Sequence, residues 1–337
     1  MSEQSRVTYI DIAKALAIFL VILGHVVNVG TPVKTILYTF HMPLFFILTG
    51  MTYKWPSNGS WHFIKERLAR NVGVLLIPYL LFALFYSKLT FSNLAYIGYS
   101  SWKTLRMAGS LSSLWFLMAL FMSHMYLLIV FKLLPKKYEE NMLLLLLIAI
   151  VLLTIGVFLP YGGKYGYPWM TNVAFVGSAF ILFGKLIRKL VNRFSDMNIA
   201  WRLFAFVVTL ILFLVMIPVN HPSPGYVLMA DGLYGNATIF AVTAFLGSVS
   251  VIMFSQISDV LFSRQSFVLW IGKNTLGIFL IHKFIVGGAQ TIINNIGYDY
   301  NNVAIACATS VIVLMVSCVI VMLINKFVPF LLHYEKR

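Results

Sequence analysis

The chain has 337 residues, of which 60% are hydrophobic and only 10% are charged. Its mean hydropathy of +0.89 excludes a soluble globular protein and predicts an integral protein of the lipid bilayer. The net charge of +15 is typical of basic loops that fix the orientation of membrane helices, so we expect no nucleic-acid partner.

Apolar runs of about 18 residues or more predict an all-α, polytopic membrane helix bundle with about ten transmembrane helices. We place these helices, in chain order, at residues 9–29, 34–53, 71–91, 112–134, 141–160, 169–188, 201–219, 233–254, 267–286 and 303–327. No internal repeat or low-complexity segment marks a second domain, so we expect one transmembrane domain over residues 1–337.

Basic residues alternate between the segments that connect these helices. One side of the membrane collects most of them, namely Arg6, Lys54, Lys65, Arg67, Arg70, Lys132, Lys136, Lys137, Lys185, Arg188, Lys189, Arg193, Arg202, Arg264, Lys273, Lys326, Lys336 and Arg337. The other side has fewer, namely Lys34, Lys88, Lys103, Arg106, Lys164 and Lys283. The positive-inside rule therefore predicts that both termini are cytoplasmic, which agrees with an even number of helices.

The first apolar helix carries most of the polar side chains that do not belong in lipid. Asp11 and Lys14 lie near its start, and His25 and Asn28 lie near its end, all on one helical face. Ionisable groups are costly in hydrocarbon, so this face is predicted to point into the bundle. A simpler alternative is that Asp11 and Lys14 neutralise each other and that His25 only packs.

Three histidines from three predicted helices share one depth in the membrane. His25 lies about 24 Å along the first helix, and His41 and His282 lie at a similar outer level in their own helices. Such histidines also occur as hydrogen-bonding links between helices. His124, in the middle of the fourth predicted helix, has no histidine at its level, and we expect it to be structural. The sequence lacks an HExxH pair and a nearby acid to orient the rings, so we expect no metal site.

Several short motifs occur in a fixed order along the chain. They are Tyr9-Ile-Asp-Ile-Ala-Lys14, Lys14 followed after ten residues by His25, Phe40-His-Met-Pro-Leu-Phe-Phe-Ile-Leu-Thr-Gly50, Ser113-Leu-Trp-Phe-Leu117, Tyr234-Gly-Asn236, and Ile271-Gly-Lys-Asn-Thr-Leu276 followed by His282. With these motifs the chain resembles the acyltransferase-3 family of membrane acyltransferases, and within it the polysaccharide O-acetyltransferases similar to fucose 4-O-acetylase. Lysine at position 14 replaces the arginine of the family signature, and Thr49 replaces a serine.

The resemblance implies transfer of an acetyl group from cytoplasmic acetyl-CoA to a hydroxyl of a cell-envelope glycan or its lipid-linked precursor, in the cytoplasmic (inner) membrane of a bacterium. An imidazole with an ordinary pKa of ~6.5 can take the proton of the attacking hydroxyl, and we assign that role of general base to His25. His41 is expected to orient the acceptor or to donate to the developing oxyanion, and a transient acyl-histidine stays open. Asp11 is expected on the same catalytic face.

The remaining candidate residues are assigned to the two substrates. Lys14, Arg67 and Arg70 are expected to hold the phosphates of coenzyme A, because phosphate binding requires cationic donors at the cytoplasmic mouth. Trp115, Asn236 and His282, which lie in or after the matched motifs, are expected to contact the acceptor.

Other functions stay open at this point. A transporter or flippase of lipid-linked sugars would also place a polar face inside a bundle of ten helices. The same acyl transfer with succinyl-CoA as donor, or with an acceptor that is not a glycan, would leave the same pattern in the sequence.

Overall fold

A computed structural model describes residues 7–53, 55, 61–159, 162–222, 225–262, 265–297 and 299–332. The described residues form helices joined by turns and loops. The helices are α1 (Thr8–Val26), α2 (Pro32–Thr52), α3 (Trp61–Asn71), α4 (Ile77–Tyr86), α5 (Phe91–Tyr99), α6 (Trp102–Met107), α7 (Trp115–Leu133), α8 (Met142–Phe158), α9 (Thr171–Ser195), α10 (Ile199–Met216), α11 (Ala237–Leu261), α12 (Ser266–Lys273), α13 (Thr275–Ile296) and α14 (Val303–Phe327). The predictions that rest on Arg6, Lys54, Arg264, Lys336 and Arg337 lie outside the described residues.

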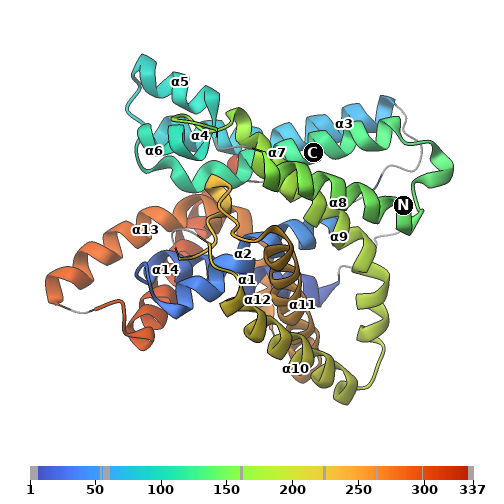
Figure 1. Cartoon of the computed structure of the whole chain (residues 1–337). Coiled ribbons are helices and arrows are strands. Elements are labelled where there is room, and N and C mark those ends of the chain that lie inside the picture. Colours follow the sequence, from blue (N-terminus) through green and yellow to red (C-terminus); the bar gives the residue numbers. More distant parts are fainter. Residues whose placement is uncertain are drawn as a thin grey trace. The chain divides into compact units, whose positions relative to one another are not determined.

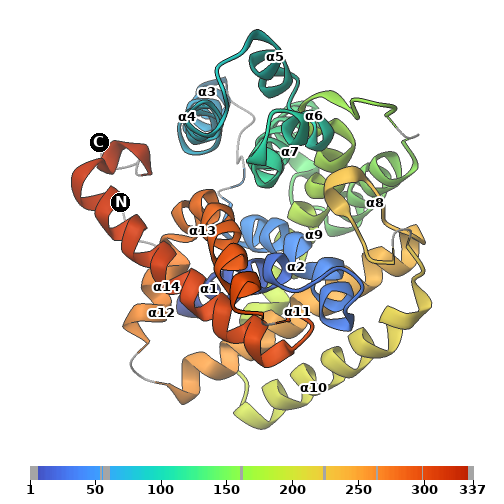
Figure 2. The same cartoon turned by 90° about the vertical axis from the view of Figure 1, so that its left-hand side faces the viewer.

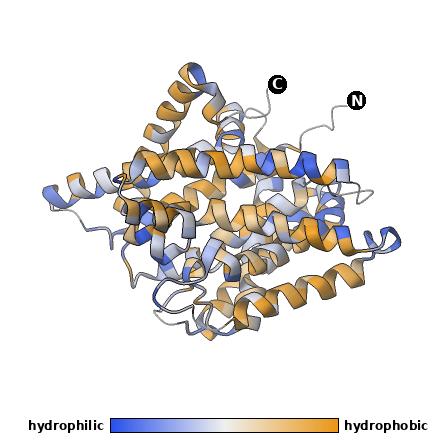
Figure 3. Cartoon of the chain, turned by 90° about the horizontal axis from the view of Figure 1, so that it is seen from above, coloured by the Kyte–Doolittle hydropathy of each residue, from blue (hydrophilic) through white to orange (hydrophobic). Residues whose placement is uncertain are grey.

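The prediction of an all-α, polytopic membrane protein is confirmed. Within the described ranges, nine helical segments are long and apolar enough to cross a bilayer, and α8 is an apolar helix of 17 residues. Hydrophobic residues cover most of the length of the helices, and hydrophilic residues gather toward their ends (Figure 3). The orientation of the termini stays a prediction.

The third membrane segment begins ten residues earlier than the sequence predicts. It runs over Trp61–Tyr86 instead of residues 71–91. The helices α3 and α4 continue into each other through a π-helical turn at Val72–Leu76 and form one rod (Figure 2). Charged side chains in α3 lower its hydropathy below that of a lipid-facing helix, so the apolar pattern did not reveal it. Arg67 and Arg70 therefore lie within a helix and not in a loop.

Two further predictions about helix ends are corrected. The predicted helix at residues 267–286 is interrupted at Asn274, whose side-chain Nδ2 donates to the Trp270 carbonyl at 2.8 Å and so competes with the regular backbone pattern. The first helix ends at Val26, so Asn28 is not part of its polar face. Instead, the Asn28 amide donates to side-chain oxygens of Asp299 and Asn301, each at 3.3 Å.

The chain divides into two compact units. Unit 1 comprises the described parts of Met1–Leu48, Ile187–Val227 and Gly235–Ile324, and unit 2 those of Thr49–Leu186, Leu228–Tyr234 and Asn325–Arg337. In unit 1, α1 packs against α11, α12 and α13, while α10 runs along α11 (Figure 1). In unit 2, α3 packs against α7, and the Ser123 and Ser178 hydroxyls link α7 to α9 through backbone carbonyls. The prediction of a single domain stays a prediction.

Two motif glycines lie where helices approach each other closely. A Cβ atom on Gly272 of α12 would lie 2.0 Å from the Asp11 carbonyl oxygen of α1, in unit 1. A Cβ atom on Gly50 of α2 would lie 1.8 Å from the Ile181 carbonyl oxygen of α9, in unit 2. Both contacts are with backbone atoms, which do not move aside as a side chain does. These glycines therefore set the spacing between helices.

We predict that Gly272→Ala destabilises the protein by about 1–3 kcal/mol, because the added methyl group must push α12 away from α1. Gly287→Ala in α13 is the matched control, since a Cβ atom there meets nothing within 4 Å. Thermal unfolding of the purified proteins in detergent measures the difference. Equal unfolding temperatures for the two variants would contradict this account of the α1–α12 contact.

Candidate functional site

Two of the predicted histidines lie side by side in unit 1. His25 in the last turn of α1 and His282 in α13 have ring centroids 5.3 Å apart, with ring planes tilted by 41°. His282 is fully buried, whereas His25 is half-buried. The structure therefore brings these two side chains together, although the helix that carries His282 is interrupted eight residues earlier.

His41 of α2 completes this group. It is buried, and its ring packs edge-on against the ring of Tyr38 at 4.9 Å. His25 lies within electrostatic reach of both His41 and His282. We call His25, His41 and His282 the histidine cluster. Among the described residues, no group of three or more His, Cys, Asp or Glu side chains is arranged to hold a metal ion.

Backbone carbonyls fix the proton position on two of these rings. The Nδ1 atom of His41 lies 2.6 Å from the Leu37 carbonyl oxygen, and the Nδ1 atom of His282 lies 2.6 Å from the Phe279 carbonyl oxygen. Because a carbonyl oxygen only accepts, Nδ1 must carry the proton. In the neutral rings Nε2 is then a hydrogen-bond acceptor. The Nε2 atom of His282 is buried and has no hydrogen-bond partner among the residues that the structure describes.

A buried lysine, Lys34, lies beside the histidine cluster. Its Nζ donates to the Val27 carbonyl at 3.2 Å and lies over the rings of Tyr38, at 5.0 Å, and Tyr226, at 6.0 Å. Lys34 interacts electrostatically with His25, as does Lys283. Sequence reasoning treated both lysines as markers of the outer side and missed them as site residues. The available signal was the position of Lys34 at the start of an apolar helix.

Asp11 and Lys14 share α1 with His25 but lie at another level of the helix. They precede His25 by 14 and 11 residues, which is ~21 Å and ~16 Å along the axis. Asp11 is only 3% exposed and lies where α1 meets Gly272 of α12. The structure thus keeps them on the helix of His25 without bringing them to the histidine cluster.

Asn236, an expected acceptor contact, caps a helix of unit 1. Its Oδ1 accepts hydrogen bonds from the backbone N–H groups of Thr238 and Ile239 at the start of α11, both at 3.1 Å. The preceding Gly235 has φ of +73°, and a Cβ atom there would lie 2.2 Å from the Asn220 side-chain oxygen. The Tyr234-Gly-Asn236 motif therefore contains a glycine that the turn requires and an asparagine that caps α11.

Three other predicted site residues belong to unit 2. Trp115 begins α7, is buried and packs edge-on against Phe116 at 5.9 Å. Arg67 is only 9% exposed, and its guanidinium lies 5.0 Å from the ring centroid of Phe63 and 5.5 Å from that of Tyr53. Arg70 is exposed and acts electrostatically on the Tyr53 phenol, as Arg67 also does.

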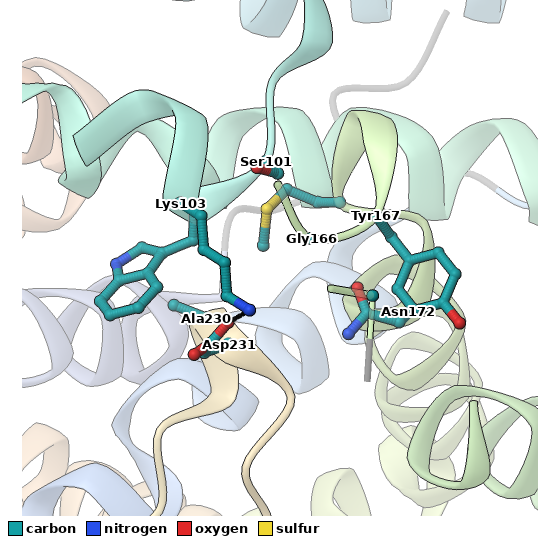
Figure 4. A pocket seen from close by; sticks show the side chains of 10 residues that line it. Ser101, Lys103, Gly166, Tyr167, Asn172, Ala230 and Asp231 are labelled. Carbon is teal, nitrogen blue, oxygen red and sulfur yellow. Dashed lines mark ion pairs between the residues drawn. The ribbon is translucent and has the colours of Figure 1, made fainter. Parts of the chain in front are cut away.

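A small polar pocket lies among the connecting segments of unit 2 (Figure 4). The Lys103 ammonium of α6 points to the Asp231 carboxylate at 3.5 Å, and Asn172 and Tyr167 lie on the facing side. Lys103 also donates to the Gly163 carbonyl at 2.9 Å. Burial raises the pKa of the Asp231 carboxyl, and the Lys103 ammonium opposes part of that rise. Since its two charges pair with each other, the pocket suits neutral polar groups.

The chain matches the family model for the acyltransferase domain, acyltransferase-3, over residues 7–322. No curated protein and no solved structure matches the chain. The family match runs from the residue before α1 into α14 and includes every member of the histidine cluster. Because it covers nearly the whole chain, the protein belongs to the acyltransferase-3 family of membrane acyltransferases.

Proposed function

We propose that this membrane acyltransferase moves an acetyl group from acetyl-CoA to a hydroxyl of a cell-envelope glycan or its lipid-linked precursor. We further propose that it belongs to the polysaccharide O-acetyltransferases similar to fucose 4-O-acetylase and works in the cytoplasmic membrane of a bacterium. The observation that carries the proposal is the histidine cluster, in which a half-buried His25 touches the buried His282. The family match favours acyl transfer over the transport of lipid-linked sugars.

In the proposed reaction His25 acts as the general base. Its imidazole accepts the proton of the acceptor hydroxyl while the hydroxyl oxygen attacks the thioester carbonyl of acetyl-CoA. The C–S bond then breaks, and the departing sulfur takes up the proton, so that the products are an O-acetyl ester and free coenzyme A. His25 suits this role because it is more exposed than His41 and His282, which are both buried.

The proton position on His41 supports one of its two expected roles over the other. A neutral His41 with its proton on Nδ1 offers Nε2 as an acceptor, which can hold the acceptor hydroxyl but cannot donate to an oxyanion. The positive charges beside the cluster are better suited to the negative charge that develops on the thioester oxygen. Lys34 and Lys283 both carry ammonium groups within electrostatic reach of His25.

The other assignments belong to the same proposal. Lys14, Arg67 and Arg70 bind the phosphates of coenzyme A, and Trp115, Asn236 and His282 contact the acceptor. Arg67 is only 9% exposed. This burial supports a specific contact with an anion, because an arginine that only fixes the orientation of a membrane helix can stay in water. The Asn236 side-chain amide nitrogen is the part of that residue suited to a sugar hydroxyl, because its oxygen caps α11. Asp11 helps to organise the polar face of α1.

We predict that His25→Ala lowers acetyl transfer by about 10²- to 10⁴-fold, the usual effect of removing a general base. The variant should fold normally, because its helix stays apolar. Turnover of purified protein with acetyl-CoA and a glycan acceptor measures the loss, and His221→Ala, in an exposed loop, is the control that should retain activity. More than about a tenth of wild-type turnover in His25→Ala would rule out the base assignment.

His41→Ala should impair transfer severely, because the acceptor hydroxyl loses the Nε2 atom that orients it. His41→Phe keeps the ring packed against Tyr38 and should be impaired to the same degree. Steady-state kinetics of both variants with varied acceptor are the measurement. Wild-type activity in His41→Phe would mean that His41 acts only by packing.

Lys14→Ala should raise the KM for acetyl-CoA more than it lowers kcat, because a cation that binds phosphate contributes to donor affinity and not to bond making. Lys14→Arg should be tolerated, since both side chains carry a positive charge. Kinetics at varied acetyl-CoA separate the two constants. Loss of kcat at saturating donor with an unchanged KM would instead indicate that Lys14 and Asp11 form a structural pair on the catalytic face.

A further inference from the structure

His124 in α7 of unit 2 has an environment that packing alone does not explain. The residue is only 6% exposed, and neither ring nitrogen has a hydrogen-bond partner among the residues that the structure describes. A buried imidazole normally satisfies at least one nitrogen, because an unmet polar atom in the interior destabilises the fold. From the sequence we expected a structural histidine. If the ring only filled space, an apolar side chain would stabilise the fold better than an imidazole with two unpaired nitrogens.

Aromatic rings form one wall beside His124. The Tyr53 ring, just after α2, stacks on the imidazole with a centroid distance of 5.0 Å and an interplanar angle of 20°. Trp55 lies edge-on to Tyr53 at 5.0 Å, and Phe131 of α7 lies 5.0 Å from Trp55. Rings from two segments of the chain thus form a continuous row that begins at the buried histidine.

Positive charges surround the same row of rings. Besides Arg67 over Tyr53, the Lys185 ammonium of α9 lies 4.9 Å from the centroid of Trp55. Arg67 and Arg70 both act electrostatically on His124. The Lys185 ammonium also lies 2.7 Å from a carboxylate oxygen of the exposed Glu140. Three cations from α3 and α9 therefore face one buried imidazole and its aromatic neighbours.

These side chains form one continuous row of contacts. Lys185 lies in the second half of α9, and Trp55, Tyr53 and His124 follow from it in contact, each with the next. This row of contacts thus combines cations, aromatic rings and the unpaired imidazole nitrogens of His124, with Arg67 and Arg70 acting on the imidazole and Lys185 over Trp55. A ligand that suits these groups carries phosphates, a planar base and uncharged amide groups. Coenzyme A has this chemistry.

We infer that His124 binds the amide-bearing arm of the coenzyme A donor, with Tyr53 stacked against the imidazole and Arg67 and Arg70 near the phosphates. This inference rests on the proposed function, which supplies the donor, and adds a binding residue that the motifs do not contain. The imidazole nitrogens hydrogen-bond an amide of the arm. His124 is a donor-binding residue and takes no part in proton transfer.

The test is equilibrium binding of two probes to the full-length protein in detergent. The probes are coenzyme A and adenosine 3′,5′-bisphosphate, which has phosphates and the base but no arm. His124→Phe should weaken coenzyme A binding by about tenfold, as expected for one lost hydrogen bond, and leave binding of the bisphosphate unchanged. Arg70→Ala, at an exposed cation, should weaken both probes. His124→Gln, which keeps a donor and an acceptor, should recover part of the affinity.

Tyr126→Leu is the matched control. Tyr126 lies on the same helix, two residues on and therefore on another face, and its ring stacks on Phe175 at 4.6 Å. It should leave the affinity for both probes unchanged. In the ligand-free state, His124→Phe should unfold at the same temperature as the wild type or higher, because it removes two unpaired nitrogens.

Three results would overturn the inference, and they are distinguishable from failure of the proposed function. Wild-type affinity of folded His124→Phe for coenzyme A would remove the binding role, and equal weakening of both probes would remove the assignment to the arm. A His124→Phe protein that does not fold would show that the ring nitrogens have a structural partner. Absence of coenzyme A binding by the wild type would instead contradict the donor in the proposed function, and the inference with it.

Discussion

The arrangement of unit 1 depends on one physical constraint, which is that the ionisable face of α1 must not contact lipid. The helix carries Asp11, Lys14 and His25, and it is covered by contacts with α11, α12 and α13. The contact with α12 is close enough to require glycine at position 272. The contact with α13 places His282 against His25. The packing that buries the polar face of α1 therefore also brings His25 and His282 together.

The two units carry different chemistry. Unit 1 contains the histidine cluster, in which two rings have Nδ1 fixed by a backbone carbonyl, and a buried lysine beside it. Unit 2 contains the arginines of α3, the row of aromatic rings and His124. An acyl transferase has to bind a polyanionic donor and also activate a neutral hydroxyl, and these tasks call for cations and for neutral imidazoles. The family match over residues 7–322 includes both sets.

The sequence predicted positions well where the chain forms a regular helix, because the number of residues then gives the distance along the helix axis. Counting residues at 1.5 Å each predicted a common level for His25 and His282, and the structure places their rings in contact despite the interruption at Asn274. The class of the fold followed from hydropathy for a similar reason, because a bilayer accepts few alternatives to long apolar helices.

The features that sequence reasoning missed depend on tertiary contacts or on mixed hydropathy. Lys34 and His124 are polar residues in mainly apolar helices, and their importance appears only when Tyr38 and Tyr53 are seen beside them. The start of the third membrane segment was misplaced because the charged residues of α3 hide its continuation into α4. Asn28 was assigned to α1 because a helix end at Val26 leaves no strong signal in an apolar sequence.

The central claim is that the chain transfers acyl groups to a hydroxyl. The most direct measurement incubates purified protein with acetyl-CoA labelled in the acetyl group and follows free thiol and labelled glycan in the same sample. The account predicts that thiol release requires the glycan and that one ester forms for each thiol released. Thiol release without a labelled glycan, or movement of a lipid-linked glycan across a vesicle membrane with no ester formed, would contradict it.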